Sequence, residues 1–178
     1  MFSNKVYIAV SLDGYISHKN NSVKWLDIVP MDKKIEIEFL DFMNSIDCVV
    51  MGKNTFNVVK SFNYKWPYNK KVFVLSSSMK SIPKGYEDKI ELLNMKPSIL
   101  VNFLNNKGYK KLYIDGGKTI QNFLEEDLID EMTISTIPVL LGEGKPLFSK
   151  LTKSKLFKVI NTRVVAQFYT QTVYKKQK

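Results

Sequence analysis

Three short segments of this chain combine glycines, hydroxyl side chains and lysines in a pattern that suits phosphate binding. They are MGKNTF at residues 51–56, LSSS at 75–78 and DGGKT at 115–119. Each begins where an apolar run ends and leads into a helix or a turn. Free backbone N–H groups, hydroxyl protons and the positive end of a helix all favour a negatively charged ligand at such a place. Together, the three segments predict a cradle for a phosphate-rich ligand.

The glycine pair of the third segment matches neither of the two common phosphate motifs. A P-loop requires a glycine five residues before its Gly-Lys-Thr, and Leu112 stands there. The dinucleotide fingerprint requires three spaced glycines after a strand, whereas Gly116 and Gly117 are adjacent. The segment is therefore neither a P-loop nor a usual Rossmann turn.

The apolar periodicity around these segments predicts strands and helices that alternate along most of the chain. In an α/β sheet the ligand site lies beyond the carboxyl ends of the strands, where all three segments fall. The final two strands have no helix between them, which indicates antiparallel pairing. We therefore expect a single domain, residues 1–178, with an α/β three-layer arrangement: a mixed, mainly parallel sheet, an antiparallel C-terminal portion and flanking helices. The predicted strands are 5–12, 47–51, 71–77, 110–115, 131–141, 156–165 and 167–176, and the predicted helices are 31–46, 52–59, 97–108 and 117–128.

Composition argues against several other classes of function. The net charge of +10 comes from lysines scattered along the chain, with Arg163 as the only arginine, so the sequence shows no dedicated nucleic-acid patch. Cys48 is the only cysteine and His18 the only histidine, which leaves no basis for a disulfide, a metal site or a Ser-His-Asp arrangement. No apolar run is long enough for a signal peptide or a membrane span. We expect a soluble cytoplasmic protein with neither a nucleic-acid nor a membrane partner.

Five segments, taken in order, resemble the dihydrofolate reductase superfamily, and most closely the reductase (RibD C-terminal-like) domain of riboflavin biosynthesis. The resemblance covers nearly the whole chain, and its last segment favours the riboflavin branch over the folate branch. The segments are AVSLDGYIS (9–17), VVMGKNTF (49–56), VFVLSSS (72–78), YIDGGKTIQNFL (113–124) and PVLLGEGKPLF (138–148).

The resemblance implies an NADPH-dependent reductase with a dihydrofolate reductase-like fold. Lys53 and Lys118 are the candidate counter-charges for the cofactor's phosphates, and two lysines without an acidic residue beside them suggest NADPH over NADH. The family's glycine pair also implies an unusual peptide geometry at Gly116–Gly117. The implied cofactor-binding residues are Ala9, Ile16, Gly52, Lys53, Asn54, Thr55, Leu75, Ser76, Ser77, Gly116, Gly117, Lys118 and Thr119.

Hydride transfer requires an acceptor that a nearby acid makes electron-poor. In the folate reductases this acid lies on the first long helix, and a count without gaps places Glu36 there. Ser135 falls where the family has a hydroxyl that orients the acid. The same helix also offers Asp32, Glu38 and Asp41, so the choice among its carboxylates stays open.

The sequence leaves two reductase substrates possible, the aminouracil of the riboflavin pathway and dihydrofolate. Lys70 stands where folate reductases place an arginine that grips a carboxylate, which weakens the folate alternative. The chain has no deaminase domain, because the HxE and PCxxC zinc pattern is absent. An alternative of another class is a non-catalytic nucleotide- or nucleic-acid-binding protein on the same fold. The resemblance also suggests a homodimer, and residues 17–30 and 61–70 are the candidate loops to close over a substrate.

Overall fold

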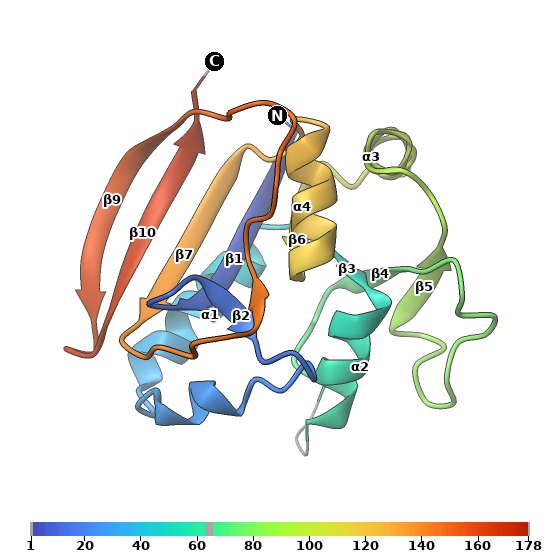
Figure 1. Ribbon diagram of the computed structural model, residues 1–178. Helices are drawn as coiled ribbons and strands as arrows, with labels where there is room; N and C mark the ends of the chain where they lie inside the picture. The colour runs from blue at the N-terminus through green and yellow to red at the C-terminus, as the bar shows by residue number, and fades with distance from the viewer. Residues whose placement is uncertain (1, 63–65, 178) are drawn as a thin grey trace.

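The computed structural model describes residues 2–62 and 66–177 and contains one eight-stranded sheet (Figure 1). The strand order is β5-β4-β3-β6-β1-β7-β10-β9. Its strands are β1 (Ser3–Ser11), β3 (Cys48–Gly52), β4 (Lys71–Leu75), β5 (Ile90–Leu93), β6 (Lys111–Asp115), β7 (Glu131–Ile137), β9 (Phe157–Val165) and β10 (Tyr169–Lys176). The helices are α1 (Lys33–Asn44), α2 (Lys53–Ser61), α3 (Pro97–Asn106) and α4 (Gly117–Glu125), with a 3-10 helix, η1 (Lys24–Ile28), ahead of α1.

The pairing of the strands confirms the predicted mixed sheet. From β5 to β7, each strand is parallel to its neighbour. Strand β10 then pairs antiparallel with both β7 and β9, as expected for strands that no helix separates. Parallel strands end at the same edge of a sheet, so the three phosphate-type segments come together beyond the ends of β3, β4 and β6.

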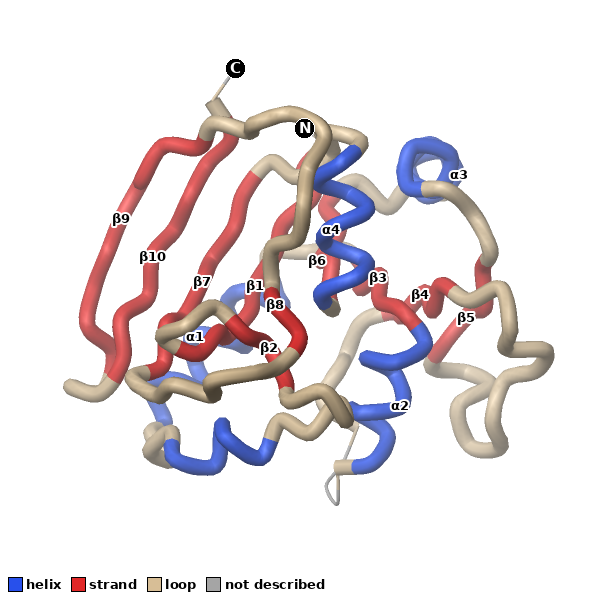
Figure 2. Tube along the Cα trace, viewed as in Figure 1, coloured by secondary structure: helices blue, strands red, loops and turns tan. Residues whose placement is uncertain are grey.

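Helices cover both faces of the sheet, and the alternation of side chains along β3 shows how. Val50 packs in a cluster with Leu100 of α3 and Phe123 of α4. Its neighbour Val49 points to the other face and packs in a cluster with Met43 of α1. Strand β3 is buried on both faces, which explains why it reads as a continuous apolar run. The predicted three-layer arrangement is confirmed (Figure 2).

A short two-stranded ribbon, β2 (Tyr15–Ser17) with β8 (Lys145–Pro146), lies outside the main sheet. The carboxylate of Asp13 accepts hydrogen bonds from the backbone N–H groups of Leu141 (3.1 Å) and Gly142 (2.7 Å), which join the segment before β2 to the segment before β8. The sequence analysis did not predict this ribbon, because strands of two or three residues show no recognisable period. Nor did it predict η1 or β5.

All the predicted strands and helices are present, with shifted ends. Strand β7 stops at Ile137 instead of at residue 141, since Pro138 has no N–H group to continue the ladder. Of the predicted loop 61–70, residues 63–65 lie outside the described part of the chain. The ring of Trp66 packs against Tyr86, with centroids 5.2 Å apart, so this end of the loop is fixed to the aromatic cluster beside α2.

Candidate functional site

One cavity of about 1070 Å³ lies at the carboxyl ends of β3, β4 and β6. All thirteen residues predicted to bind the cofactor line it, so the structure brings them together; their role in binding stays a prediction. The cavity is larger than most pockets that hold one drug-sized molecule. It has room for a dinucleotide and a small second ligand.

Helix α2 begins at the cavity wall with no side chain capping its first turn. The N-cap residue is Gly52, and the first turn contains no acidic residue. The ammonium group of Lys53 donates a 3.1 Å hydrogen bond to the hydroxyl of Ser78. This bond places the cation next to residues 76–78, the serine turn that follows β4. The positive helix end and the lysine together favour an anion here.

The serine turn is itself held by its first hydroxyl. Ser76 Oγ accepts hydrogen bonds from the backbone N–H groups of Ser78 (3.2 Å) and Met79 (2.9 Å). Both bonds use lone pairs of the oxygen, which leaves the hydroxyl proton of Ser76 free to be donated to a ligand. Ser77 is exposed and lines the same wall.

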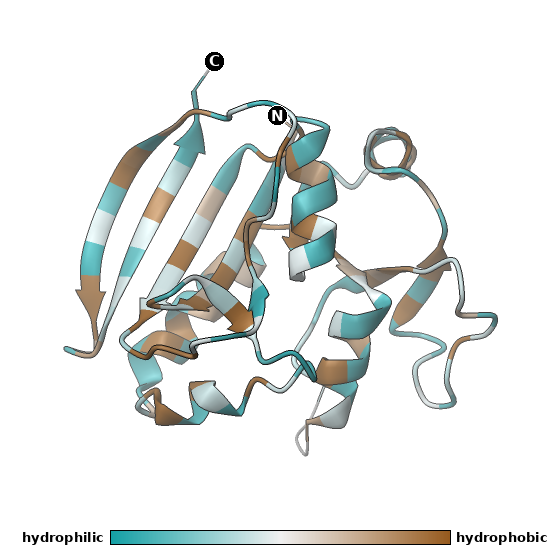
Figure 3. Cartoon of the chain, viewed as in Figure 1, coloured by the Kyte–Doolittle hydropathy of each residue, from teal (hydrophilic) through white to brown (hydrophobic). Residues whose placement is uncertain are grey.

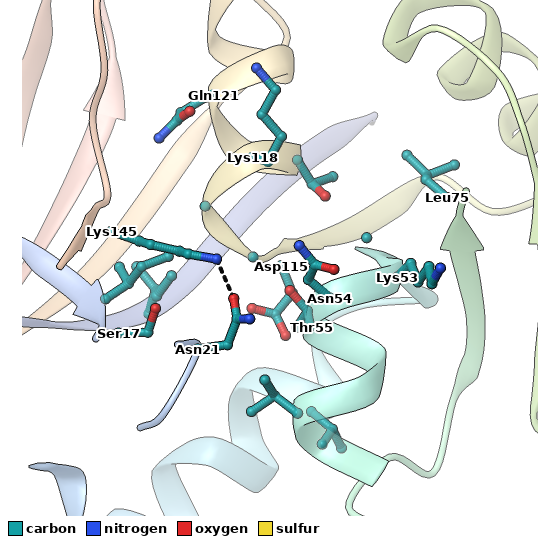
Figure 4. A pocket seen from close by; sticks show the side chains of 18 of the residues that line it. Ser17, Asn21, Lys53, Asn54, Thr55, Leu75, Asp115, Lys118, Gln121 and Lys145 are labelled. Atoms are coloured by element: carbon teal, nitrogen blue, oxygen red, sulfur yellow. Dashed lines mark hydrogen bonds between the residues drawn. The ribbon is translucent and has the colours of Figure 1, made fainter. Parts of the chain in front are cut away.

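Helix α4 also begins at the cavity without a side-chain cap, at the glycine pair. Gly116 has φ +87°, a conformation that L side chains rarely adopt. The described residues contain no cis peptide bond, so the unusual feature of the glycine pair is the positive φ of Gly116. Lys118 lies on the exposed side of the first turn and still contributes to the cavity wall (Figure 4).

The glycines make room for other side chains of the protein. A Cβ atom on Gly116 would overlap with Oγ1 of Thr55, and one on Gly117 would lie 2.5 Å from Cδ1 of Ile16. The sequence reading assigned this bare backbone to the cofactor alone. In the structure, the missing side chains at Gly116 and Gly117 also allow Thr55 of α2 and Ile16 of β2 to pack against the start of α4.

Asp115 is the only aspartate or glutamate among the described residues that line the cavity. Desolvation by burial raises the pKa of its carboxyl group to about 6, although the Gly116 N–H group and a hydrogen bond of 3.2 Å from the Tyr68 hydroxyl favour the charged form. The sequence analysis did not select Asp115. The available signal was its position, immediately before the glycine pair at the carboxyl end of a central strand.

The wall opposite α2 is formed by the ribbon, which supplies a third lysine. Lys145 donates a hydrogen bond to the side chain of Asn21, and Figure 4 shows the two on one side of Asp115, with the start of α2 on the other. The amide of Gln121 in α4 donates to the backbone carbonyls of Pro146 and Leu147, each at 3.1 Å. These bonds fix the ribbon against α4. Lys145 was missed because β8 is formed by contacts between segments that are distant in the sequence.

The structure does not bring the two predicted catalytic residues together. Glu36 is exposed and does not line the cavity. Ser135 is buried outside the cavity, where its hydroxyl accepts a 3.0 Å hydrogen bond from Gln171. The carboxylate of α1 that faces the sheet is Glu38, which forms an ion pair of 2.8 Å with Arg163. Residues 36 and 38 point to different sides of the helix, so a count without gaps selected the solvent side.

No group of three or more His, Cys, Asp or Glu side chains among the described residues is placed to hold a metal ion. No helix in the same part of the chain has the length and apolar character that crossing a membrane requires.

Comparison with known proteins gives matches along nearly the whole chain. The sequence model of the RibD C-terminal domain matches residues 5–170. Uncharacterized protein YwjB of Bacillus subtilis (strain 168) is 33% identical over 165 residues, which cover 91% of each chain. A crystal structure from Shewanella sp. PV-4, of a protein named after riboflavin biosynthesis, is 49% identical with a TM-score of 0.94 over 99% of each chain.

A more distant structure shows that the fold is shared with the folate reductases. Dihydrofolate reductase from Enterococcus faecalis, solved with NADP(H), has a TM-score of 0.67 at 15% identity, covering 99% of this chain and 97% of the other. This likeness confirms the predicted dihydrofolate reductase-like fold. From the match to residues 5–170, together with the two closer relatives, the chain belongs to the family of the RibD C-terminal domain.

Proposed function

We propose that this protein is an NADPH-dependent reductase that transfers a hydride to a small heterocyclic or imine substrate, most like the riboflavin-pathway 5-amino-6-(5-phosphoribosylamino)uracil reductase. The observation that carries the proposal is one cavity with two uncapped helix starts and a single carboxyl group of raised pKa. Membership of the RibD C-terminal domain family supports the same reading.

The phosphates of the cofactor are assigned to the starts of α2 and α4. Each start offers backbone N–H groups without a side-chain partner, and each carries a lysine, Lys53 or Lys118. The serine turn adds the hydroxyls of Ser76 and Ser77 beside Lys53, which suits the 2′-phosphate that distinguishes NADPH from NADH. Bound NADPH would supply the hydride.

The proton for the same reduction is assigned to Asp115. Adding a hydride to the carbon of a C=N bond requires a proton on the nitrogen, and the best donor has a pKa near the working pH. Burial raises the pKa of Asp115 to about 6, and no other acidic side chain of the described chain lines the cavity. Lys145 and Asn21, beside Asp115, would hold the polar groups of the substrate (Figure 4).

The experiment that tests the function is an assay of NADPH oxidation with two substrates, dihydrofolate and the deaminated ribosylaminouracil phosphate. Lys70, at the position of the folate enzymes' arginine, does not line the cavity, which favours the second substrate. Turnover with the aminouracil compound and little with dihydrofolate is the expected result. NADPH binding without turnover of any heterocycle or imine would favour the non-catalytic alternative.

We also propose that two copies pair through the edge of the sheet formed by β9. Strand β9 is nine residues long and forms that edge (Figure 3). Its residues from Lys158 to Val164 are exposed. Its side chains at Val159 and Val164 are 59% and 67% exposed. A long exposed edge strand that carries apolar side chains tends to pair with another chain unless it is protected. Light scattering should give twice the mass of one chain for the wild type and the mass of one chain for Val164→Lys; a monomeric wild type would exclude the pairing.

A further inference from the structure

The side chain of Tyr7 joins the cavity to a network of polar side chains on α1, β9 and β10. Tyr7 lines the cavity, and its ring packs against Phe39 and Phe42 of α1 with centroids 5.8 and 4.8 Å apart. The side-chain amide of Gln171 in β10 donates a 3.2 Å hydrogen bond to the Tyr7 hydroxyl. The packing holds the ring in place, and the hydrogen bond holds its oxygen.

The neighbours of Gln171 determine which way round its amide group lies. The guanidinium group of Arg163 can only donate, and it donates a 2.6 Å hydrogen bond to the side-chain oxygen of Gln171. The amide nitrogen therefore faces two hydroxyls, Ser135 at 3.0 Å and Tyr7 at 3.2 Å, and has one proton for each. Arg163 is itself held by an ion pair of 2.8 Å with Glu38.

This arrangement makes the Tyr7 proton available to a ligand. Because Gln171 donates, the Tyr7 oxygen accepts, and the single proton of the phenol is left for another bond. The hydroxyl donates no hydrogen bond to any other residue in the described part of the chain. Burial raises the pKa of Tyr7 above its ordinary value, so the proton is present at neutral pH. Tyr7 therefore offers the cavity a donor and not an acceptor.

Tyr7 lies on the same side of the sheet as the proposed proton donor. Tyr113 donates a 2.8 Å hydrogen bond from its hydroxyl to the backbone carbonyl of Tyr7, and both side chains belong to the apolar cluster on the α1 side of the sheet. Side chains alternate along a strand, so Asp115, two residues after Tyr113, points to that side as well. A ring bound against Tyr7 is therefore on the Asp115 side of the sheet.

We propose that the Tyr7 hydroxyl binds the substrate by donating a hydrogen bond to a carbonyl oxygen of its ring, and that Gln171 and Arg163 are positioning residues that keep this hydroxyl a donor. The inference rests on the proposed function, because the ligand beside Asp115 is taken to be the substrate. It deepens that function by naming the substrate class, a planar heterocycle that carries a ring carbonyl group, as uracils do. An amino group at the same position of the ring would place a second donor against Tyr7, which disfavours such a ring.

The test uses 6-aminouracil, labelled with a heavy carbon isotope at its carbonyl groups, as the probe bound to the protein without cofactor. A hydrogen bond lowers the infrared stretching frequency of a carbonyl group, so one labelled band should lie lower on the wild type than on Tyr7→Phe. The lost bond should also raise the Kd of the probe by about 2- to 10-fold in Tyr7→Phe. Tyr109→Phe is the matched control: Tyr109 packs on Phe73 with centroids 5.3 Å apart and does not line the cavity, so neither quantity should change.

The positioning residues are tested by two substitutions of Arg163. Arg163→Met removes the donor that orients Gln171, so the amide can turn its oxygen to Tyr7 and accept the phenol proton in place of the probe. The carbonyl band should then move toward its position on Tyr7→Phe, and the nitrogen NMR signal of the Gln171 side chain should shift. Arg163→Lys keeps a cation that can only donate, so it should retain the wild-type position of both signals.

Equal carbonyl frequencies on the wild type and Tyr7→Phe would overturn the inference, and so would a probe that does not bind. If Tyr7→Phe does not fold, the two Arg163 variants decide: a carbonyl band that Arg163→Met leaves at the wild-type frequency would refute the arrangement. Neither readout uses NADPH or turnover, so failure of this inference is distinguished from failure of the reductase assay.

Discussion

The hydroxyl of Tyr68 and the carboxyl group of Asp115 are joined by a 3.2 Å hydrogen bond although 47 residues separate them in the chain. Tyr68 belongs to the segment between α2 and β4, and Asp115 ends the central strand β6. The bond restrains Asp115, the one acidic side chain among the described residues of the cavity wall, near the two helix starts that are assigned to the cofactor. The proposed proton donor therefore lies beside the proposed phosphate site of the cofactor.

Replacing Asp115 by asparagine should separate chemistry from cofactor binding. We expect Asp115→Asn to lower kcat by about 10²- to 10⁴-fold, because asparagine cannot give up a proton, while the Kd for NADPH changes little. Steady-state assays and a fluorescence titration measure the two quantities. Glu36→Gln is the matched control on α1 and should retain near wild-type turnover, since Glu36 is exposed outside the cavity. The reverse pattern would return the role of the acid to α1.

The same substitution should change the pH dependence of stability. The folded-state pKa of Asp115 is raised to about 6 from an ordinary value near 4, so its ionisation costs nothing below about pH 4 and destabilises the folded protein increasingly as the pH rises through 6. Relative to the wild type, Asp115→Asn should gain about 2 to 3 kcal/mol of unfolding free energy between pH 4 and pH 8. Urea unfolding at a series of pH values measures this difference. A constant difference across the range would show that the pKa is not raised.

Removal of the Lys53 ammonium group should weaken the binding of NADPH more than the binding of NADH. Lys53 lies at the start of α2 beside the serine turn, and we expect Lys53→Ala to raise the Kd for NADPH by about 10- to 100-fold, since charge-assisted hydrogen bonds contribute roughly 1.5 to 3 kcal/mol. The Kd for NADH should change much less. Lys60→Ala is the control, because Lys60 lies in the last turn of the same helix and outside the cavity. Equal losses for both cofactors would refute the assignment to the 2′-phosphate.

The close contact between the glycine pair and the ribbon can be tested as a double-mutant cycle. A methyl group on Gly117 would meet Cδ1 of Ile16, so Gly117→Ala should destabilise the protein by about 1 kcal/mol or more. Ile16→Val removes that carbon, and the double variant should recover part of the loss in thermal or urea unfolding. Strictly additive effects would mean that the two residues do not restrain each other.

The sequence was informative where local pattern determines position. Strand β3 could be predicted because a run buried on both faces is apolar throughout, and the phosphate-type loops could be grouped because parallel strands end at one edge. For the same reason, the eleven predicted cofactor residues at and just after the ends of β3, β4 and β6 line one cavity. Glycine, hydroxyl and lysine residues directly after a strand form a local pattern, and a local pattern can be recognised from the sequence alone.

The remaining part of the site depends on contacts that no local pattern records. Glu36 was selected by counting along α1, but the rotation of that helix on the sheet places Glu38 inward, paired with Arg163 from the distant strand β9. Lys145 reaches the cavity because Asp13 binds the backbone at Leu141 and Gly142 across the ribbon. Asp115 was visible in the sequence as a carboxylate, but its raised pKa results from burial that only the folded chain creates.

The most direct measurement is a fluorescence titration of the wild-type protein with NADPH and, in parallel, with NADH. A cavity with two open helix starts, Lys53 and the serine turn predicts saturable NADPH binding at submillimolar concentration and clearly weaker binding of NADH. No detectable binding of NADPH in that range would contradict the proposal that this protein is an NADPH-dependent reductase.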